Sequence, residues 1–140
     1  MKTLALDIGD KWVGSALSDA IGLTCKPYKT VSIEMLNKFL EEALKTEPIS
    51  TVVVGYPKTL KGNESDQTKK TVQVKEKLET IFAQINGREI KWVLWDERLS
   101  SKRAGSIEGR KKGVDDKLKE HSIAAAFILQ TFLDFKSLSF

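Results

Sequence analysis

The stretch Thr3–Ser18, TLALDIGDKWVGSALS, contains two short apolar segments separated by Gly9–Lys11. A short apolar run that is bounded by turn residues is typical of a buried β-strand. The two segments therefore predict neighbouring strands, Thr3–Ile8 and Trp12–Ser18, joined as a β-hairpin. The spacing also predicts that Gly9 takes a positive φ angle in the turn between them.

The rest of the chain continues with alternating helical and strand patterns. Apolar residues recur at helical spacing in three segments and form short apolar runs in two others, and a further strand is expected within a segment where Pro27 is consistent with a sheet edge or a bulge. The predicted strands are within Leu23–Ser32, at Thr51–Gly55 and at Ile90–Trp95, and the predicted helices are Ile33–Lys45, Asp66–Ile85 and Leu118–Phe135. Asn86-Gly87 is expected to end the second helix, and Tyr56–Ser65 and Ser106–Lys117 are expected to be loops.

This order of elements predicts an α/β fold. Hairpins followed by βαβ crossovers imply a central five-stranded mixed sheet with helices on both faces. No linker or internal repeat interrupts the pattern, so residues 1–140 are expected to form a single domain.

Composition excludes several classes of protein. The hydrophobic fraction of 41% argues against disorder, and the single cysteine excludes an intramolecular disulfide. Cys25 and His121 are the only soft ligands, which disfavours a structural zinc site. The sequence lacks a signal-peptide pattern and a run of about 18 apolar residues, so we expect a cytoplasmic protein without a membrane partner. The net charge of +4 is compatible with a polyanionic partner.

Carboxylates lie at the ends of two predicted strands. Asp7 is near the end of the first, and Asp96 and Glu97 follow the last. Ligand sites gather at the carboxyl ends of strands, and oxygen ligands suit Mg²⁺ or Mn²⁺. Such ions could activate water for phosphodiester cleavage. Taken singly, Asp7 could instead cap a turn, and the acid pair could be a solvated strand end neutralised by Arg98.

Four segments of the chain resemble one family. LDIGDKWVGSALSD (Leu6–Asp19), VVGYPKTLKG (Val53–Gly62), WDERLS (Trp95–Ser100) and AAAFILQTFL (Ala124–Leu133) follow one another as in the RuvX/YqgF family. That family is known for pre-16S rRNA nucleases and for Holliday-junction-resolvase-like proteins. The resemblance covers nearly the whole chain and implies an RNase H-like fold. It also implies a cytoplasmic protein that matures the 5′ end of small-subunit rRNA with a divalent metal.

The resemblance also implies a set of site residues. It assigns catalytic roles to Asp7, Asp96, Glu97 and His121. It also implies that Asp7, Glu97 and His121 bind Mg²⁺ or Mn²⁺. His121 stands in the last helix where the family usually has an Asp. Imidazole is a poorer ligand for Mg²⁺ than for Mn²⁺, and the alternative for His121 is a satisfied core histidine.

Two further features concern nucleic-acid contacts. Trp12 stands where the family often has a basic residue, so a phosphate contact could be missing there or Trp12 could stack on a base. Basic residues near the predicted site would hold phosphates, although a charge run is also typical of plain solvated surface. The residues in question are Lys58, Lys61, Arg98, Lys102, Arg103, Arg110, Lys111 and Lys112.

The sequence thus supports one leading hypothesis and leaves two others open. The leading hypothesis is a metal-dependent endonuclease that hydrolyses phosphodiester bonds of structured RNA at the 5′ end of pre-16S rRNA. The second is a Holliday-junction DNA resolvase, which would usually need a dimer, and the oligomeric state is left open. The third is a catalytically weakened RNA-binding protein of ribosome assembly, in which His121 replaces a required acid.

Overall fold

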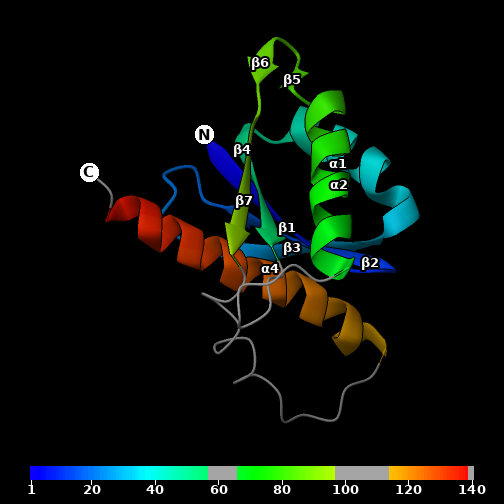
Figure 1. Cartoon of the computed structure of the whole chain (residues 1–140). Coiled ribbons are helices and arrows are strands. Elements are labelled where there is room, and N and C mark those ends of the chain that lie inside the picture. The colour runs from blue at the N-terminus through cyan, green and yellow to red at the C-terminus, as the bar shows by residue number, and fades with distance from the viewer. Residues whose placement is uncertain (57–65, 97–113, 139–140) are drawn as a thin grey trace.

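The computed structural model describes residues 1–56, 66–96 and 114–138. A five-stranded mixed sheet forms its centre, with the strand order β3-β2-β1-β4-β7 (Figure 1). These strands are β1 (Lys2–Ile8), β2 (Trp12–Ser18), β3 (Cys25–Ser32), β4 (Ile49–Tyr56) and β7 (Lys91–Asp96). The pairs β1–β2 and β2–β3 are antiparallel, whereas β1–β4 and β4–β7 are parallel. The predicted five-stranded mixed sheet is therefore confirmed.

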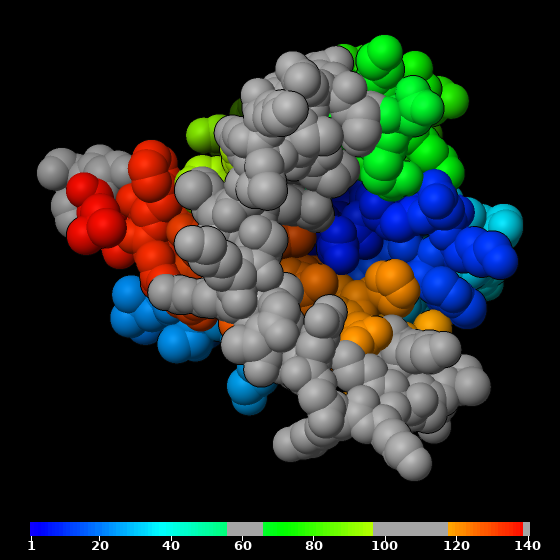
Figure 2. Space-filling view, turned by 60° about the horizontal axis from the view of Figure 1, so that its bottom comes forward, coloured from blue at the N-terminus to red at the C-terminus, as the bar shows by residue number. Residues whose placement is uncertain are grey.

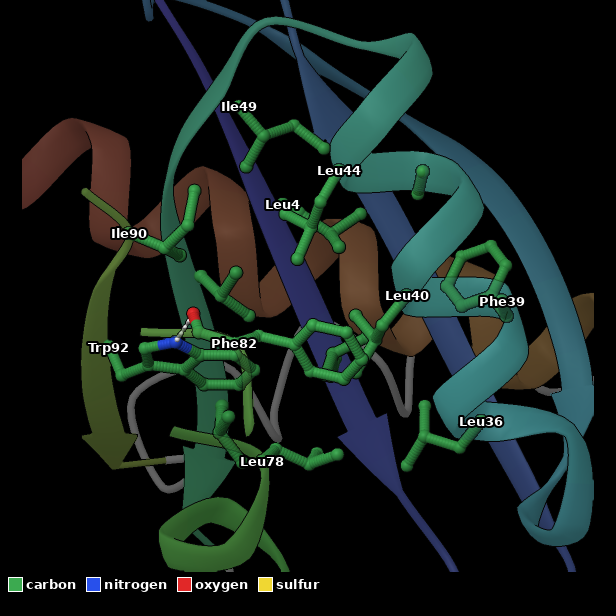
Figure 3. Close-up of a cluster of buried hydrophobic side chains, with 14 of the residues drawn as sticks. Leu4, Leu36, Phe39, Leu40, Leu44, Ile49, Leu78, Phe82, Ile90 and Trp92 are labelled. Atoms are coloured by element: carbon green, nitrogen blue, oxygen red, sulfur yellow. Dashed lines mark hydrogen bonds between the residues drawn. The ribbon is translucent and has the colours of Figure 1, made fainter. Parts of the chain in front are cut away.

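One face of the sheet is covered by α1 (Leu36–Thr46) and α2 (Asp66–Ile81). Figure 3 shows the apolar cluster between these helices and the strands, where the Trp92 indole N–H donates to the Phe82 carbonyl oxygen at 3.1 Å. Apolar residues at every second position of β1 point into this cluster, as strand alternation requires. Its β1 members are Leu4, Leu6 and Ile8.

The opposite face is covered by α4 (Val114–Ser137), the long helix in Figure 1. Small residues of the sheet, among them Ala5 and Ala16, pack against the helix residues Ala125 and Leu129. Helices on both faces are thus confirmed. None of the helices in the described ranges is long and apolar enough to cross a membrane.

The predicted conformation of Gly9 is wrong. Among the described glycines, only Gly22 and Gly87 have positive φ angles. The Gly9 amide instead donates to the Trp12 carbonyl oxygen at 2.9 Å, and a Cβ at residue 9 would lie 3.0 Å from that oxygen. Glycine is needed there because the backbone of the hairpin approaches closely, not because of a left-handed conformation.

Helix boundaries also differ from the prediction. The second helix ends at Ile81, and Asn86-Gly87 is the turn of a short hairpin between β5 (Gln84–Ile85) and β6 (Arg88–Glu89). Asn86 and Gly87 have φ angles of 50° and 78°, which a two-residue hairpin turn with two left-handed residues requires. A short 3-10 turn, Ile33–Met35, precedes α1, and α4 begins at Val114, inside the segment that we expected to be a loop.

Candidate functional site

Asp7 lies at the carboxyl end of β1 on the face covered by α4. The neighbours Leu6 and Ile8 point into the opposite cluster, so alternation places Asp7 with Ala5 on the α4 side. Asp7 is half-buried, and no hydrogen bond or ion pair joins its carboxylate to the described part of the chain. A half-buried carboxylate without a partner costs free energy, which a bound cation would offset.

Gly14 brings the last helix to this corner of the sheet. Gly14 is the antiparallel partner of Asp7 across β1 and β2. A Cβ at residue 14 would overlap the His121 carbonyl group and lie 2.6 Å from the Ser122 backbone nitrogen. The absence of a side chain therefore lets the backbone of α4 rest directly on β2. The Thr30 hydroxyl, which donates to the Leu118 carbonyl oxygen at 2.6 Å, ties the preceding helical turn to β3.

The His121 side chain reaches the turn that follows Asp7. Its ring atom Cε1 lies 4.0 Å from the position that a Cβ of Gly9 would take. The imidazole is half-buried, and neither ring nitrogen has a hydrogen-bond partner within the described ranges. The structure thus brings Asp7 and His121 to one corner, although 113 residues lie between them along the chain.

Asp96, like Asp7, lies at the carboxyl end of its strand, but it lies on the opposite face of the sheet. It pairs with Tyr56 at the end of β4, two strands away from β1, which corresponds to about 10 Å between backbones. Alternation along β7 groups Asp96 with Trp92, which belongs to the cluster under α1 and α2. Asp96 is half-buried and already takes part in another interaction.

The remaining predicted site residues lie outside the described residues. These are Glu97 and the basic residues Lys58, Lys61, Arg98, Lys102, Arg103, Arg110, Lys111 and Lys112. Within residues 1–56, 66–96 and 114–138, no three His, Cys, Asp or Glu side chains gather closely enough to hold a metal ion. Within these ranges, Asp7 and His121 supply two potential metal ligands at one corner, and neither side chain has another partner there.

Helix α2 supplies contacts that the sequence did not predict. The Gln67 side-chain amide donates to the Ile8 carbonyl oxygen at 3.2 Å, and the Lys70 ammonium lies 3.1 Å from an Asp10 carboxylate oxygen. Both contacts support the strand end and turn next to Asp7. Figure 2 shows this corner from outside, with the blue hairpin between the green α2 and the orange part of α4. No sequence signal marks Gln67, because its partner is 59 residues away.

Cys25 lies away from this corner and is predicted to be chemically inert. Burial, followed by the nearby negative charges of Asp134 and Asp19, raises the pKa of its thiol to about 11. The thiol also donates to the Ala126 carbonyl oxygen at 3.2 Å. We expect iodoacetamide to label Cys25 at pH 8 at least tenfold more slowly in the folded protein than in urea, because only the thiolate reacts. Equal rates, measured by mass spectrometry, would contradict the observed burial.

The same raised pKa predicts how stability depends on pH. The pKa rises from its ordinary value of 9.0 to about 11, so the folded state favours the protonated thiol. This contribution to the free energy of unfolding is fully present below pH 9 and is lost as the pH rises toward 11. Urea titrations of the wild type and of Cys25→Ala would measure it: the wild type should lose more stability than the variant over this interval.

Comparisons with known proteins agree on one family. A family model described as RuvX, Holliday junction resolvase, matches residues 1–135. A protein of Sulfurihydrogenibium sp. is 36% identical over 99% of this chain and 93% of its own, and one of Fusobacterium nucleatum is 39% identical over 95% and 96%. Both are named "Putative pre-16S rRNA nuclease".

A solved structure supports the same grouping at the level of the fold. T. thermophilus RuvC in complex with a Holliday junction substrate has a TM-score of 0.60 and 10% identity, and the alignment covers 99% of this chain and 98% of that one. At this identity the likeness concerns the fold alone, which is the predicted RNase H-like α/β fold. The match over residues 1–135 and the identities to relatives of similar length show that this chain belongs to the RuvX family.

Proposed function

We propose that this protein is a metal-dependent endonuclease that hydrolyses phosphodiester bonds of structured RNA and processes the 5′ end of pre-16S rRNA. The names of its relatives support this class of substrate and reaction. The whole chain, residues 1–140, would act as one domain in the cytoplasm. The observation that carries the proposal is that the Asp7 carboxylate and the His121 imidazole lie at one corner and have no partner among residues 1–56, 66–96 and 114–138.

The residues at this corner suit a divalent cation. Asp7 offers carboxylate oxygens, the ligands that Mg²⁺ and Mn²⁺ prefer, and His121 offers an imidazole nitrogen, which Mn²⁺ accepts more readily. We assign Glu97, which follows Asp96 directly along the chain, as a third ligand. When bound, such an ion polarises a phosphoryl oxygen and makes water a stronger nucleophile at neutral pH.

The protein's own residues would prepare the reaction in three ways. The pairing of Asp7 with Gly14 fixes the carboxylate at the strand end, and the Gln67 amide holds the next carbonyl group in place. Asp96, at the carboxyl end of β7 and on the other face, would orient a water or a ligand rather than share the face of Asp7. The attacking water forms a new P–O bond while the ester P–O bond breaks, and the leaving oxygen takes up a proton.

The basic residues that lie outside the described ranges complete this proposal. We assign Lys58, Lys61, Arg98, Lys102, Arg103, Arg110, Lys111 and Lys112 to phosphate contacts along the RNA. Such contacts would position the backbone without reading its sequence. They would also make binding weaker as the salt concentration rises.

A cleavage assay tests the proposed function. The substrates are an RNA that spans the 5′ end of mature 16S rRNA and a four-way DNA junction, each with Mg²⁺ or Mn²⁺. The proposal expects cleavage of the RNA with a defined product end and no symmetric cleavage of the junction. Resolution of the junction without RNA cleavage would favour the second candidate, a resolvase, which the description of the family model supports. Tight RNA binding without cleavage of either substrate would favour an assembly protein.

The metal preference gives a prediction for His121→Asp. A carboxylate adds a negatively charged oxygen ligand, which Mg²⁺ prefers over a neutral imidazole. We expect the variant to cleave about tenfold faster than the wild type in Mg²⁺, and the wild type to work better in Mn²⁺ than in Mg²⁺. Initial rates of both proteins in each metal measure this. Identical rates in Mg²⁺ would remove His121 from the site.

A further inference from the structure

Trp12 has a large aromatic ring that the fold covers only in part. The residue stands at the start of β2 and is 37% exposed. The Trp92 indole donates to the Phe82 carbonyl oxygen at 3.1 Å, and the Trp95 indole donates to the Thr131 hydroxyl at 3.0 Å. The Trp12 indole has neither a hydrogen bond nor a ring partner in the described part of the chain. Burying an aromatic ring is strongly favourable, so packing does not explain this exposed one.

Trp12 lies on the same face and at the same end of the sheet as Asp7. It is two residues from Gly14 along β2 and therefore shares the side on which Gly14 touches the His121 backbone. Because Gly14 pairs with Asp7, the step from Gly14 to Trp12 carries the ring about 7 Å beyond the carboxylate along the strand. The Gly9 amide, which donates to the Trp12 carbonyl oxygen, fixes the backbone at this point.

The charges around the ring suit a polyanion. Lys11, the preceding residue, is exposed and has no ion pair within the described ranges. Asp10 is paired with Lys70 at 3.1 Å, so the acid of the turn is already matched by a cation. Asp7 adds a negative charge on the same face, which the proposed divalent cation would offset, so Lys11 is the cation of the turn that remains available to a phosphate. Phosphates would be attracted to the edge of the ring and its surroundings.

We propose that Trp12 is a stacking platform for an unpaired base next to the phosphate that would be cleaved at the Asp7 site. This inference rests on the proposed function and names its substrate more closely: nucleic acid that is single-stranded at the reaction centre. An exposed indole offers a flat face to a base, and a base in a duplex has no free face for it. The flanking cations and the shared face with Asp7 favour an RNA strand over an apolar protein partner.

Binding experiments without divalent metal test the stacking separately from cleavage. The probe is a single-stranded RNA spanning the 5′ end of 16S rRNA, compared with the same RNA annealed to its complement. Trp12→Ala should weaken single-strand binding about five- to hundredfold, while Trp12→Phe should retain most of the affinity. Duplex binding should change less than twofold. Ile21→Ala, which shortens a side chain that is 75% exposed, is the matched control and should change neither.

A scan with single abasic nucleotides identifies the stacked base. One abasic position should weaken binding to the wild type and have no further effect on Trp12→Ala, because both changes remove the same contact. Equal loss for single strand and duplex, additive effects at every position, or Trp12→Phe as weak as Trp12→Ala would each overturn the stacking role. If Trp12→Ala binds the RNA as tightly as the wild type but no longer binds an apolar peptide that the wild type captures, the ring contacts a protein partner.

The cleavage assay keeps the two proposals apart. If the wild type cleaves the RNA and Trp12→Ala binds it as tightly, the stacking inference fails and the nuclease proposal stands. If the abasic scan shows the coupling with Trp12 but no metal supports cleavage, the nuclease proposal fails and the platform remains.

Discussion

Asp7→Asn is expected to abolish RNA cleavage and to leave the protein folded. Loss of a carboxylate ligand should lower the rate by at least about a hundredfold, because even changes to groups behind metal ligands cost about 10- to 100-fold. The Asp7 carboxylate makes no hydrogen bond or ion pair with the described residues, so the substitution breaks no such contact there. Removing a half-buried unpaired charge should leave the melting temperature unchanged or raise it slightly. Single-turnover cleavage and thermal unfolding measure the two effects.

Asp134→Asn is the matched control for this substitution. Asp134 is exposed near the end of α4 and accepts a hydrogen bond from Gln130 at 2.9 Å, far from β1's carboxyl end along the helix. The same change of charge there should leave cleavage unaffected. Cleavage by Asp7→Asn at the control's rate would locate the catalytic site elsewhere. An unfolded Asp7→Asn protein would show that Asp7 has a structural role.

Gly14→Ala is expected to be strongly destabilising. A Cβ at this position would overlap backbone atoms of His121, which cannot rotate away as a flexible side chain can. Overpacking usually costs about 1–3 kcal/mol, and a clash with helix backbone should cost about 3 kcal/mol or more. The lifted helix would also carry His121 away from Asp7, so cleavage should fall as well. Urea titration gives the change in the free energy of unfolding.

Gly22→Ala separates this clash from ordinary effects of replacing glycine. Gly22 has a φ angle of 74°, and a Cβ there would meet nothing within 4 Å. Its substitution should cost only about 1 kcal/mol, from backbone strain. If Gly14→Ala proved no more destabilising than Gly22→Ala, the close approach of α4 to β2 would be contradicted.

The sequence predicted those parts of the fold that depend on local pattern. Short apolar runs and the turn residues between them located the strands of the central sheet, and the order of elements predicted a mixed sheet with a helix layer on each face. Local pattern failed where one signal has two meanings. An Asn-Gly pair can end a helix or form a hairpin turn. Here the residues on either side of Asn86-Gly87 pair as two short strands, so the pair forms a hairpin turn. Similarly, Gly9 serves close approach of the Trp12 carbonyl group rather than a left-handed turn.

The candidate site was predictable only in part. The resemblance placed Asp7 and His121 in one site. The structure brings them to one corner because Gly14 has no side chain that would keep α4 away from β2. Contacts from Gln67 and Lys70 could not be predicted, because they depend on how α2 docks against the end of β1. The different face of Asp96 follows from the register of β7, which the sequence alone does not give.

The central claim is that Asp7 and His121 bind one divalent cation, and the single histidine of the chain allows a direct measurement. Paramagnetic Mn²⁺ broadens NMR signals of nearby protons, and the imidazole ring signals of tag-free protein can come only from His121. We predict that these signals broaden at low Mn²⁺ in the wild type and in Asp134→Asn, and stay sharp in Asp7→Asn at the same concentration. Sharp signals in the wild type, or equal broadening in Asp7→Asn, would contradict a shared metal site.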